Sequence, residues 1–345
     1  RSAERGDFIE GIRALVIDKD RNPKWKHKLG DALLTESSAM LRPLGQQKLD
    51  LSEKTMKIGF VGLGNMGSPM ATNLRASGHE VLGFDITSPC PDGVTQVTNV
   101  AAVAAGANVV ITMLPNGTIA KSVAAEVLSA MAQGSVLLDC STIDVASARE
   151  IAQMADSRGV EFLDAPVSGG VAGAVAGSLT FMVGGSGKAF GKARPLFDVM
   201  GQKAVHCGPA GNGQAAKICN NMILGITMIG TCEAFALADK LGLHRQAMFD
   251  VVSTSSGYSW SMNAYCPAPG IGPSSPADND YLPGFAAELM LKDLRLSQQA
   301  ATDADADTPM GAAATALYEA FVEYEDGAGQ DFSAMLPRFE KRSRK

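Results

Sequence analysis

The stretch from residue 57 to residue 67 constrains the fold of this 345-residue chain more than any other. It reads Lys57-Ile-Gly-Phe-Val-Gly-Leu-Gly-Asn-Met-Gly67, an apolar run followed by a glycine-rich turn. This pattern predicts a buried strand that leads directly into a helix. Gly62 permits the tight turn, Gly64 lets phosphates approach the backbone, and Gly67 lets the helix pack closely on the strand. The phosphates then lie at a helix N-terminus, which favours negative charge.

The sequence around this turn supports a dinucleotide site. A helix is expected over residues 68–77, and a second strand over 80–84 ends at Asp85. An acidic residue at that place accepts hydrogen bonds from the adenosine ribose. The alternative is a domain of the same fold in which the turn binds nothing. We expect the cofactor to contact Gly62, Leu63, Gly64, Asn65, Met66, Gly67 and Asp85.

Composition limits the class of partner. The net charge is −6, the isoelectric point is about 5.3, and 46% of the residues are hydrophobic. An acidic chain is a poor ligand for nucleic acid or for an anionic membrane, and we expect no apolar run that could span a bilayer. The six cysteines are scattered and form no CxxC pair. We therefore expect reduced thiols, with Cys140 and Cys232 in the core, and no metal site.

The pattern from residue 56 to about residue 208 alternates between short apolar runs and alanine-rich helical stretches. This alternation predicts an α/β fold, a doubly wound parallel sheet of the Rossmann type. Asp144 is expected to cap the N-terminus of the helix over 145–157. The expected strands are 57–61, 81–84, 108–113, 135–139, 161–163, 179–183 and 204–206, with helices over 119–131 and 145–157 among them.

The pattern changes near residue 211. Residues 214–241 form one apolar run of helical period, about 40 Å long at 1.5 Å per residue. Further helices are expected over 288–301, 309–325 and 332–340, and a Pro/Gly-rich segment spans 266–284. We therefore expect three parts: an extension or linker (1–55), an NAD-binding Rossmann domain (56–210), and an all-α substrate and dimerisation domain (211–345) joined to it by the long helix.

Two clusters follow predicted strands. They are Thr112-Met-Leu-Pro-Asn116 and Asp139-Cys-Ser-Thr-Ile143. Ligands of open α/β sheets bind beyond such strand ends. The first cluster could line such a ligand site or be a turn into the next helix. The hydroxyls of the second could contact a nicotinamide or simply cap the next helix.

Two further clusters carry groups suited to a small acid. Ser168, Gly169 and Gly170 could offer a hydroxyl and bare N–H groups to a carboxylate, or could be a mobile loop. Lys217 and Asn221 are four residues apart and share one helix face. Burial would depress the pKa of Lys217 and make it a proton acceptor, whereas a lysine on a helix is ordinarily solvated.

One more charged pair lies within an apolar helical stretch. Lys292 and Asp293 stand in the sequence Leu-Met-Leu-Lys-Asp-Leu. The pair could face the cleft between the two domains, or it could be the polar side of an amphipathic helix. The sequence leaves both possibilities open.

Together these motifs resemble the β-hydroxyacid dehydrogenase family, and within it the 3-hydroxyisobutyrate branch, over residues 56 to about 340. The branch rests on Tyr265-Cys-Pro-Ala-Pro-Gly270 and Tyr281-Leu-Pro-Gly-Phe285. Cys266 stands where the family has Asn, and Arg295 where Gly is usual. The family motifs are Gly59-Phe-Val-Gly-Leu-Gly-Asn-Met-Gly67, Met113-Leu-Pro115, Asp139-Cys-Ser-Thr142, Asp164-Ala-Pro-Val-Ser-Gly-Gly170, Gly211-Asn-Gly-Gln-Ala-Ala-Lys217-Ile-Cys-Asn-Asn221 and Leu289-Met-Leu-Lys-Asp-Leu294.

The resemblance implies a role for each matched position. Lys217 would be the acid/base, Asn221 would place the substrate, and Ser168, Gly169 and Gly170 would bind its carboxylate. The nicotinamide would be lined by Leu114, Pro115, Thr142 and Lys292.

The implied reaction is the oxidation of 3-hydroxyisobutyrate to methylmalonate semialdehyde, a step of valine catabolism, by a homo-oligomer (dimer or tetramer). NAD is expected as cofactor, because Asp85 is followed by Ile86 and not by an arginine. The alternatives are another family member, such as a tartronate semialdehyde reductase, or a nucleotide-binding module without catalysis.

The segment 7–25 carries a second resemblance. It is similar to the C-terminal end of 3-hydroxyisobutyryl-CoA hydrolase, of the enoyl-CoA hydratase superfamily. We expect an upstream fused hydrolase domain and a linker over 26–54. The location would be the mitochondrial matrix if the source is eukaryotic, and otherwise the cytoplasm. The alternative is an amphipathic helix followed by a linker.

Overall fold

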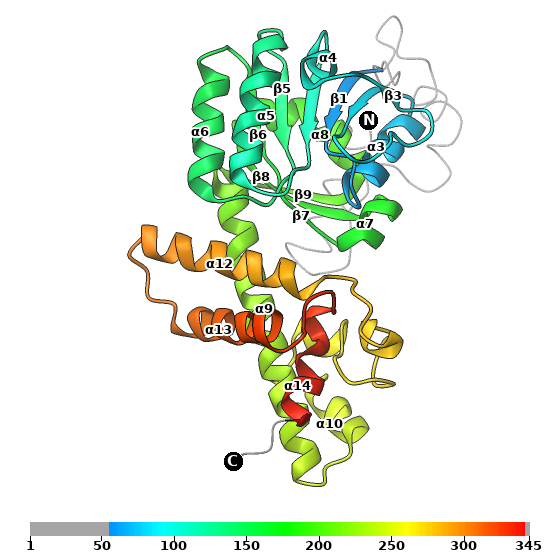
Figure 1. Ribbon diagram of the computed structural model, residues 1–345, viewed down its shortest axis with the longest axis vertical. Coiled ribbons are helices and arrows are strands. Elements are labelled where there is room, and N and C mark those ends of the chain that lie inside the picture. Colours follow the sequence, from blue (N-terminus) through cyan, green and yellow to red (C-terminus); the bar gives the residue numbers. More distant parts are fainter. Residues whose placement is uncertain (1–54, 342–345) are drawn as a thin grey trace, which may run out of the picture. The chain divides into compact units, whose positions relative to one another are not determined.

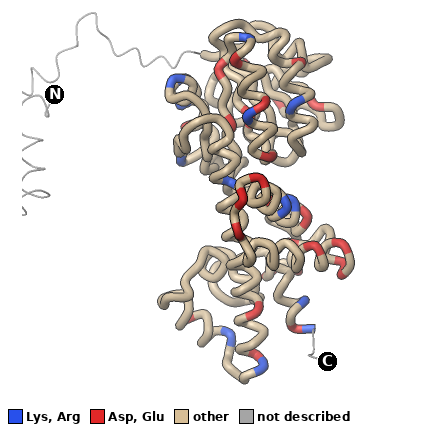
Figure 2. Tube along the Cα trace, turned by 90° about the vertical axis from the view of Figure 1, so that its left-hand side faces the viewer, with Lys and Arg blue, Asp and Glu red and all other residues tan. Residues whose placement is uncertain are grey.

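The computed structural model describes residues 55–341 (Figure 1). The expectations for 7–25 and 26–54 therefore lie outside the described residues. The described chain begins with an α/β part and continues into a helical part. Figure 2 shows that both parts carry acidic as well as basic residues.

A nine-stranded sheet forms the centre of the α/β part in residues 55–341. The strand order is β3-β2-β1-β4-β5-β6-β8-β7, with β9 beside β8. The strands are β1 (Lys57–Val61), β2 (Glu80–Phe84), β3 (Thr95–Gln96), β4 (Val109–Thr112), β5 (Val136–Asp139), β6 (Glu161–Asp164), β7 (Val167–Ser168), β8 (Leu179–Gly185) and β9 (Gly201–Gly208).

The Rossmann-type fold is confirmed, with one difference at the sheet edge. The strands from β3 to β6 are all parallel, as expected. In contrast, β8 runs antiparallel to both β6 and β7, and β9 runs parallel to β8. The sheet is therefore parallel from β3 to β6 and mixed only at this edge, where the expected parallel direction does not hold. An apolar run looks the same in either direction, and direction depends on how the connection returns the chain.

Helices cover both faces of the sheet because its strands are apolar on both faces. Ile58 and Phe60 pack on one side with α3 (Gly67–Ala76), α7 (Gly170–Ala176) and α8 (Gly187–Met200). Val61, Val110 and Leu137 pack on the other side. The helices on that second side are α4 (Val100–Ala104), α5 (Gly117–Ala130) and α6 (Val145–Asp156). The alternation of side chains along each strand thus builds two apolar layers.

The expected cap of α6 is confirmed. The side chain of Asp144 accepts a hydrogen bond of 2.7 Å from the backbone N–H of Ser147. Cys140 and Cys232 are fully buried in the two parts, as the apolar pattern predicted.

The long helix α9 (Asn212–Lys240) is the centre of the helical part. It packs against α10 (Arg245–Val252), α11 (Trp260–Asn263), α12 (Ala287–Asp303), α13 (Pro309–Tyr324) and α14 (Met335–Lys341). By length and composition α9 could also cross a membrane, so the expectation that no such run exists was wrong. That resemblance is weak evidence, because a helix with neighbours on several sides is apolar around much of its circumference.

The last expected helix is divided in two. Residues 332–334 form a 3₁₀ turn, η3 (Phe332–Ala334), and α14 begins only at Met335. The buried Asp331 explains the break. Its side chain accepts hydrogen bonds from the backbone N–H and the hydroxyl of Ser333, which favours a tight turn. The Pro/Gly-rich segment before α12 contains one more 3₁₀ turn, η2 (Pro276–Asn279).

An ion pair with a buried arginine and a half-buried glutamate joins the end of α13 to α14. The Nε and Nη2 atoms of Arg338 donate to the carboxylate of Glu325 at 2.5 and 3.0 Å, and the Arg338 side chain is only 4% exposed. The Nη1 atom of Arg338 is buried without a partner. Arg338 therefore depends on Glu325, since removing one partner leaves a buried charge unpaired.

We expect Glu325→Leu to lower the free energy of unfolding by about 2–4 kcal/mol, measured by urea denaturation. The matched control is Asp198→Asn, which breaks the exposed pair with Arg194 on α8. That change should cost less than about 0.5 kcal/mol. Equal effects of the two substitutions would contradict the importance of the buried pair.

Candidate active site

The glycine turn fits an anionic ligand. A Cβ on Gly62 would lie 2.3 Å from the carbonyl oxygen of Met113, and one on Gly67 would lie 1.9 Å from the carbonyl oxygen of Gly62. A Cβ on Gly64 would meet nothing within 4 Å, so the backbone there is open. No side chain caps the N-terminus of α3, and its first turn holds no acidic residue. Open backbone beside an uncapped helix start suits a pyrophosphate.

Asp85 is held beside this turn. Its Oδ2 accepts the backbone N–H of Leu63 at 2.7 Å, and its Oδ1 accepts the N–H groups of Thr87 and Ser88 at 2.8 Å. Partial burial raises the pKa of Asp85, but the N–H groups of Ser88, Thr87 and Leu63 outweigh burial and lower it overall. The carboxylate therefore stays ionised and fixed in direction.

The two strand-end clusters are joined to each other. The backbone N–H of Leu114 donates to Oγ of Ser141 at 2.8 Å, and the Ser141 hydroxyl donates to Oδ1 of Asp139 at 2.5 Å. The hydroxyl of Thr112 donates to the same oxygen at 2.7 Å. Burial raises the pKa of Asp139 to about 6, and the hydroxyls of Ser141 and Thr112 oppose that rise. The structure thus places Leu114 and Pro115 next to the loop that contains Thr142.

Lys217 and Asn221 lie in the first turns of α9 and are both buried, with 7% and 1% of their surface exposed. The alternative of a solvated lysine is therefore wrong. Burial lowers the pKa of Lys217, the nearby Asp293 opposes this, and Lys292 adds to it. A lysine in such a setting releases its proton more readily than one in water.

Helix α12 contributes both members of its charged pair to the same place. The Lys292 ammonium donates to the carbonyl oxygen of Thr142 at 2.7 Å, which joins α12 to the α/β part. The Asp293 carboxylate accepts from the side-chain amide of Asn221 at 2.5 Å. Burial raises the pKa of Asp293, opposed by Lys217 and Lys292. The pair therefore faces the junction of the two parts and not solvent.

Ser168, Gly169 and Gly170 have no hydrogen bond to this cluster within residues 55–341. Ser168 ends β7, and the two glycines follow with φ angles of +133° and +61°. A Cβ on Gly170 would be 3.6 Å from the carbonyl oxygen of Gly284, in the segment before α12. Within residues 55–341 no hydrogen bond joins Ser168 to Lys217 or Asn221. Gly170 thus lies beside the segment that leads into α12, and the predicted carboxylate contact of these three residues remains a prediction.

Two further buried polar residues, Asp164 and Gln214, lie beside the site without having been predicted as part of it. Asp164 accepts the backbone N–H groups of Gly211 and Gln214 at 2.7 and 2.9 Å. The side-chain amide of Gln214 donates to the carbonyl oxygen of Ser141 at 2.8 Å and accepts from the N–H of Ile143 at 3.1 Å. Asp293 was likewise not among the predicted site residues. The sequence feature that could have revealed these three residues is a polar side chain next to a glycine or inside an apolar run.

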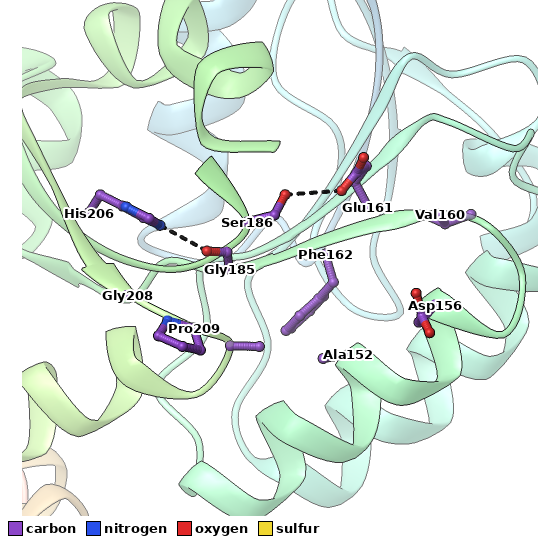
Figure 3. A pocket seen from close by; sticks show the side chains of 11 residues that line it. Ala152, Asp156, Val160, Glu161, Phe162, Gly185, Ser186, His206, Gly208 and Pro209 are labelled. Carbon is purple, nitrogen blue, oxygen red and sulfur yellow. Dashed lines mark hydrogen bonds between the residues drawn. The ribbon is translucent and has the colours of Figure 1, made fainter. Parts of the chain in front are cut away.

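Figure 3 shows a separate hollow of about 520 Å³ on the α/β part. In it the ring of His206 makes a 2.8 Å hydrogen bond with the carbonyl oxygen of Gly185, and Ser186 donates to Glu161 at 3.1 Å. None of its lining residues belongs to the expected site. They are Ala152, Asp156, Val160, Glu161, Phe162, Gly185, Ser186, His206, Gly208, Pro209 and Ala210.

Three family models match the chain. Residues 57–208 match the NAD-binding domain of 6-phosphogluconate dehydrogenase. Residues 211–339 match the model described as NAD-binding of NADP-dependent 3-hydroxyisobutyrate dehydrogenase. Residues 1–38 match the enoyl-CoA hydratase/isomerase family, in agreement with the resemblance found in the segment 7–25.

Relatives match the same region. A probable 3-hydroxyisobutyrate dehydrogenase of Mycobacterium tuberculosis is 46% identical over 284 residues, which is 81% of this chain and 96% of the relative. The NAD-dependent L-serine dehydrogenase of Pseudomonas aeruginosa is 45% identical over 292 residues, 82% of this chain and 98% of the relative.

A solved structure of the Mycobacterium tuberculosis 3-hydroxyisobutyrate dehydrogenase with L-serine superimposes with a TM-score of 0.79. It shares 45% identity and covers 82% of this chain and 99% of that one. The glycine turn, the uncapped α3 and the buried lysine at the junction are all compatible with a nicotinamide-dependent oxidoreductase. This chain belongs to the 3-hydroxyisobutyrate dehydrogenase family of β-hydroxyacid dehydrogenases.

Proposed function

We propose that this enzyme oxidises 3-hydroxyisobutyrate to methylmalonate semialdehyde with NAD, and that Lys217 takes up the proton. The observation that carries the proposal is the buried cluster of Lys217, Asn221 and Asp293 at the junction of the two parts. Burial lowers the pKa of Lys217, as a proton acceptor at neutral pH requires. The matches to dehydrogenases of this family support the reaction class.

The proposed steps follow from the positions of the side chains. The neutral amine of Lys217 accepts the proton of the primary hydroxyl, while Asn221, held by Asp293, orients the substrate. A nicotinamide cofactor held by the glycine turn and Asp85 would supply the acceptor for the hydride of the carbinol carbon. The hydroxyl of Ser168 and the N–H groups of Gly169 and Gly170 bind the carboxylate at the other end of the acid. One proton and one hydride leave the alcohol, which becomes an aldehyde.

L-serine is the second candidate substrate. It is also a 3-hydroxy acid, with an amino group in place of the methyl group. The relative from Pseudomonas aeruginosa is named for it, and the solved relative contains it. Initial rates with both acids decide between them. A higher kcat/KM for L-serine than for 3-hydroxyisobutyrate would overturn the proposed substrate.

Lys217→Ala should lower kcat by about a hundredfold to ten-thousandfold, because a positioned acid/base contributes that much. Since the pKa of Lys217 is lowered, kcat/KM of the wild-type enzyme should rise with pH through this pKa, below the usual range for lysine. The variant should lose that rise. The control is Lys240→Ala, in the last turn of α9. A folded Lys217 variant with near wild-type turnover would refute the proposed role.

NAD should be preferred to NADP by about tenfold or more in kcat/KM. The ionised Asp85 accepts from ribose hydroxyls and repels a 2′-phosphate, and such charged hydrogen bonds contribute about 1.5–3 kcal/mol. Asp85→Asn should lower the ratio of kcat/KM with NAD to kcat/KM with NADP, whereas Asp92→Asn in an exposed loop should leave that ratio unchanged. Equal or better kcat/KM with NADP for the wild-type enzyme would show that the preference is wrong.

The enzyme is further proposed to form a homo-oligomer through the end of α9. Leu237 and Leu241 are four residues apart there and are 59% and 75% exposed. Light scattering after gel filtration should give a dimer or tetramer, and Leu237→Glu with Leu241→Glu should reduce its size because both charges would be buried at the contact. The control is Met310→Glu on α13, also exposed. A monomeric wild-type enzyme would contradict the proposal.

A further inference from the structure

One loop at the junction contacts three other elements. This loop, residues 140–143, follows Asp139, the last residue of β5. The hydroxyl oxygen of its Ser141 accepts a hydrogen bond from the backbone N–H of Leu114, in the loop after β4. The carbonyl oxygen of its Thr142 accepts a hydrogen bond from the Lys292 ammonium on α12. The third contact comes from α9, through the side chain of Gln214. The loop thus connects the expected nicotinamide side of the site with both helices that supply its buried charges.

Gln214 makes its two hydrogen bonds to this loop in opposite senses. Its amide nitrogen donates to the carbonyl oxygen of Ser141, and its amide oxygen accepts the N–H of Ile143. Gln214 is fully buried, so water cannot replace its side-chain amide as the partner of the Ser141 carbonyl or the Ile143 N–H. Two bonds from one planar group restrict both the distance and the rotation of the loop relative to α9.

Gln214 also lies three residues before Lys217, on the same side of the first turns of α9. Its own backbone N–H is bonded to the buried carboxylate of Asp164 at the end of β6. The first turn of α9 is thus held at two points, by Asp164 through the backbone and by Gln214 through its side chain.

We propose that Gln214 is a positioning residue that fixes the amine of Lys217 relative to the nicotinamide-side loops through its paired bonds to Ser141 and Ile143. This inference rests on the proposed acid–base role of Lys217. A misplacement of about 1 Å can cost a hundredfold in rate, so loss of these bonds has a measurable effect on turnover. Cofactor affinity should change less than turnover, because no hydrogen bond joins Gln214 to the glycine turn or to Asp85 within residues 55–341, and only the loop around Thr142 on the nicotinamide side depends on Gln214.

The first test compares Gln214→Met with the wild-type enzyme. Methionine keeps the length of the side chain but can make neither bond. We expect kcat to fall about tenfold to a hundredfold, while KM for NAD changes by a smaller factor than kcat. Gln246→Met on the exposed face of α10 is the control and should leave both constants unchanged.

The second test uses pH. In Gln214→Glu, a protonated carboxyl can donate to Ser141 and accept from Ile143 as the amide does, whereas an ionised one cannot donate. Burial raises the pKa of such a carboxyl, as do the carboxylates of Asp164 and Asp139, while the ammonium groups of Lys217 and Lys292 oppose the rise. The kcat of this variant, divided by that of the wild-type enzyme at each pH, should therefore increase as pH falls. The same ratio for Gln214→Met should stay flat.

The outcomes separate the two proposals. A wild-type kcat in the Met variant, or equal losses in the Met and Glu variants at every pH, would overturn the positioning role. If Gln214→Met fails to fold, the pH series of Gln214→Glu alone decides the question. Failure of the proposed function looks different, since the wild-type enzyme would then not oxidise the acid, or Lys217→Ala would keep its turnover.

Discussion

The attachment of α9 to the sheet is the constraint on which the rest of the site depends. At the end of β6, the buried Asp164 accepts the N–H groups that open α9, where a helix has unpaired donors and a partial positive charge. Burial raises the pKa of Asp164, and the N–H groups of Gly211 and Gln214 oppose that rise. One carboxylate thus connects the sheet to the helix that carries Lys217 and Asn221.

The charges at the junction influence one another because they share a buried space. Lys217 and Lys292 each have their pKa lowered by burial, and Asp293 opposes this for both. A cluster of two amines and one carboxylate favours the loss of one proton, since two buried cations repel each other. Lys292 is held by the carbonyl of Thr142, whereas Lys217 has no hydrogen-bond partner among residues 55–341. Of the two amines, Lys217 is therefore the one that no hydrogen bond holds, as its proposed acid–base role requires.

Most of the strands and helices were predictable, and the misses have physical causes. The runs that became β1, β4 and β5 are continuous and apolar, as strands buried on both faces must be. The two-residue strands β3 and β7 are too short to show any period, so no pattern could reveal them. The direction of β8 was missed because side-chain pattern does not encode it.

The sequence by itself determined the glycine turn, the acidic end of β2, the sequence positions of Lys217 and Asn221 and the order of domains, because these depend on local backbone geometry and periodicity. Only the tertiary structure decided which polar residues meet. Asp293 is 72 positions from Asn221, and Gln214 is more than 70 from the loop that it holds. Such contacts follow from packing α9 and α12 against the sheet, and no spacing along the chain records them.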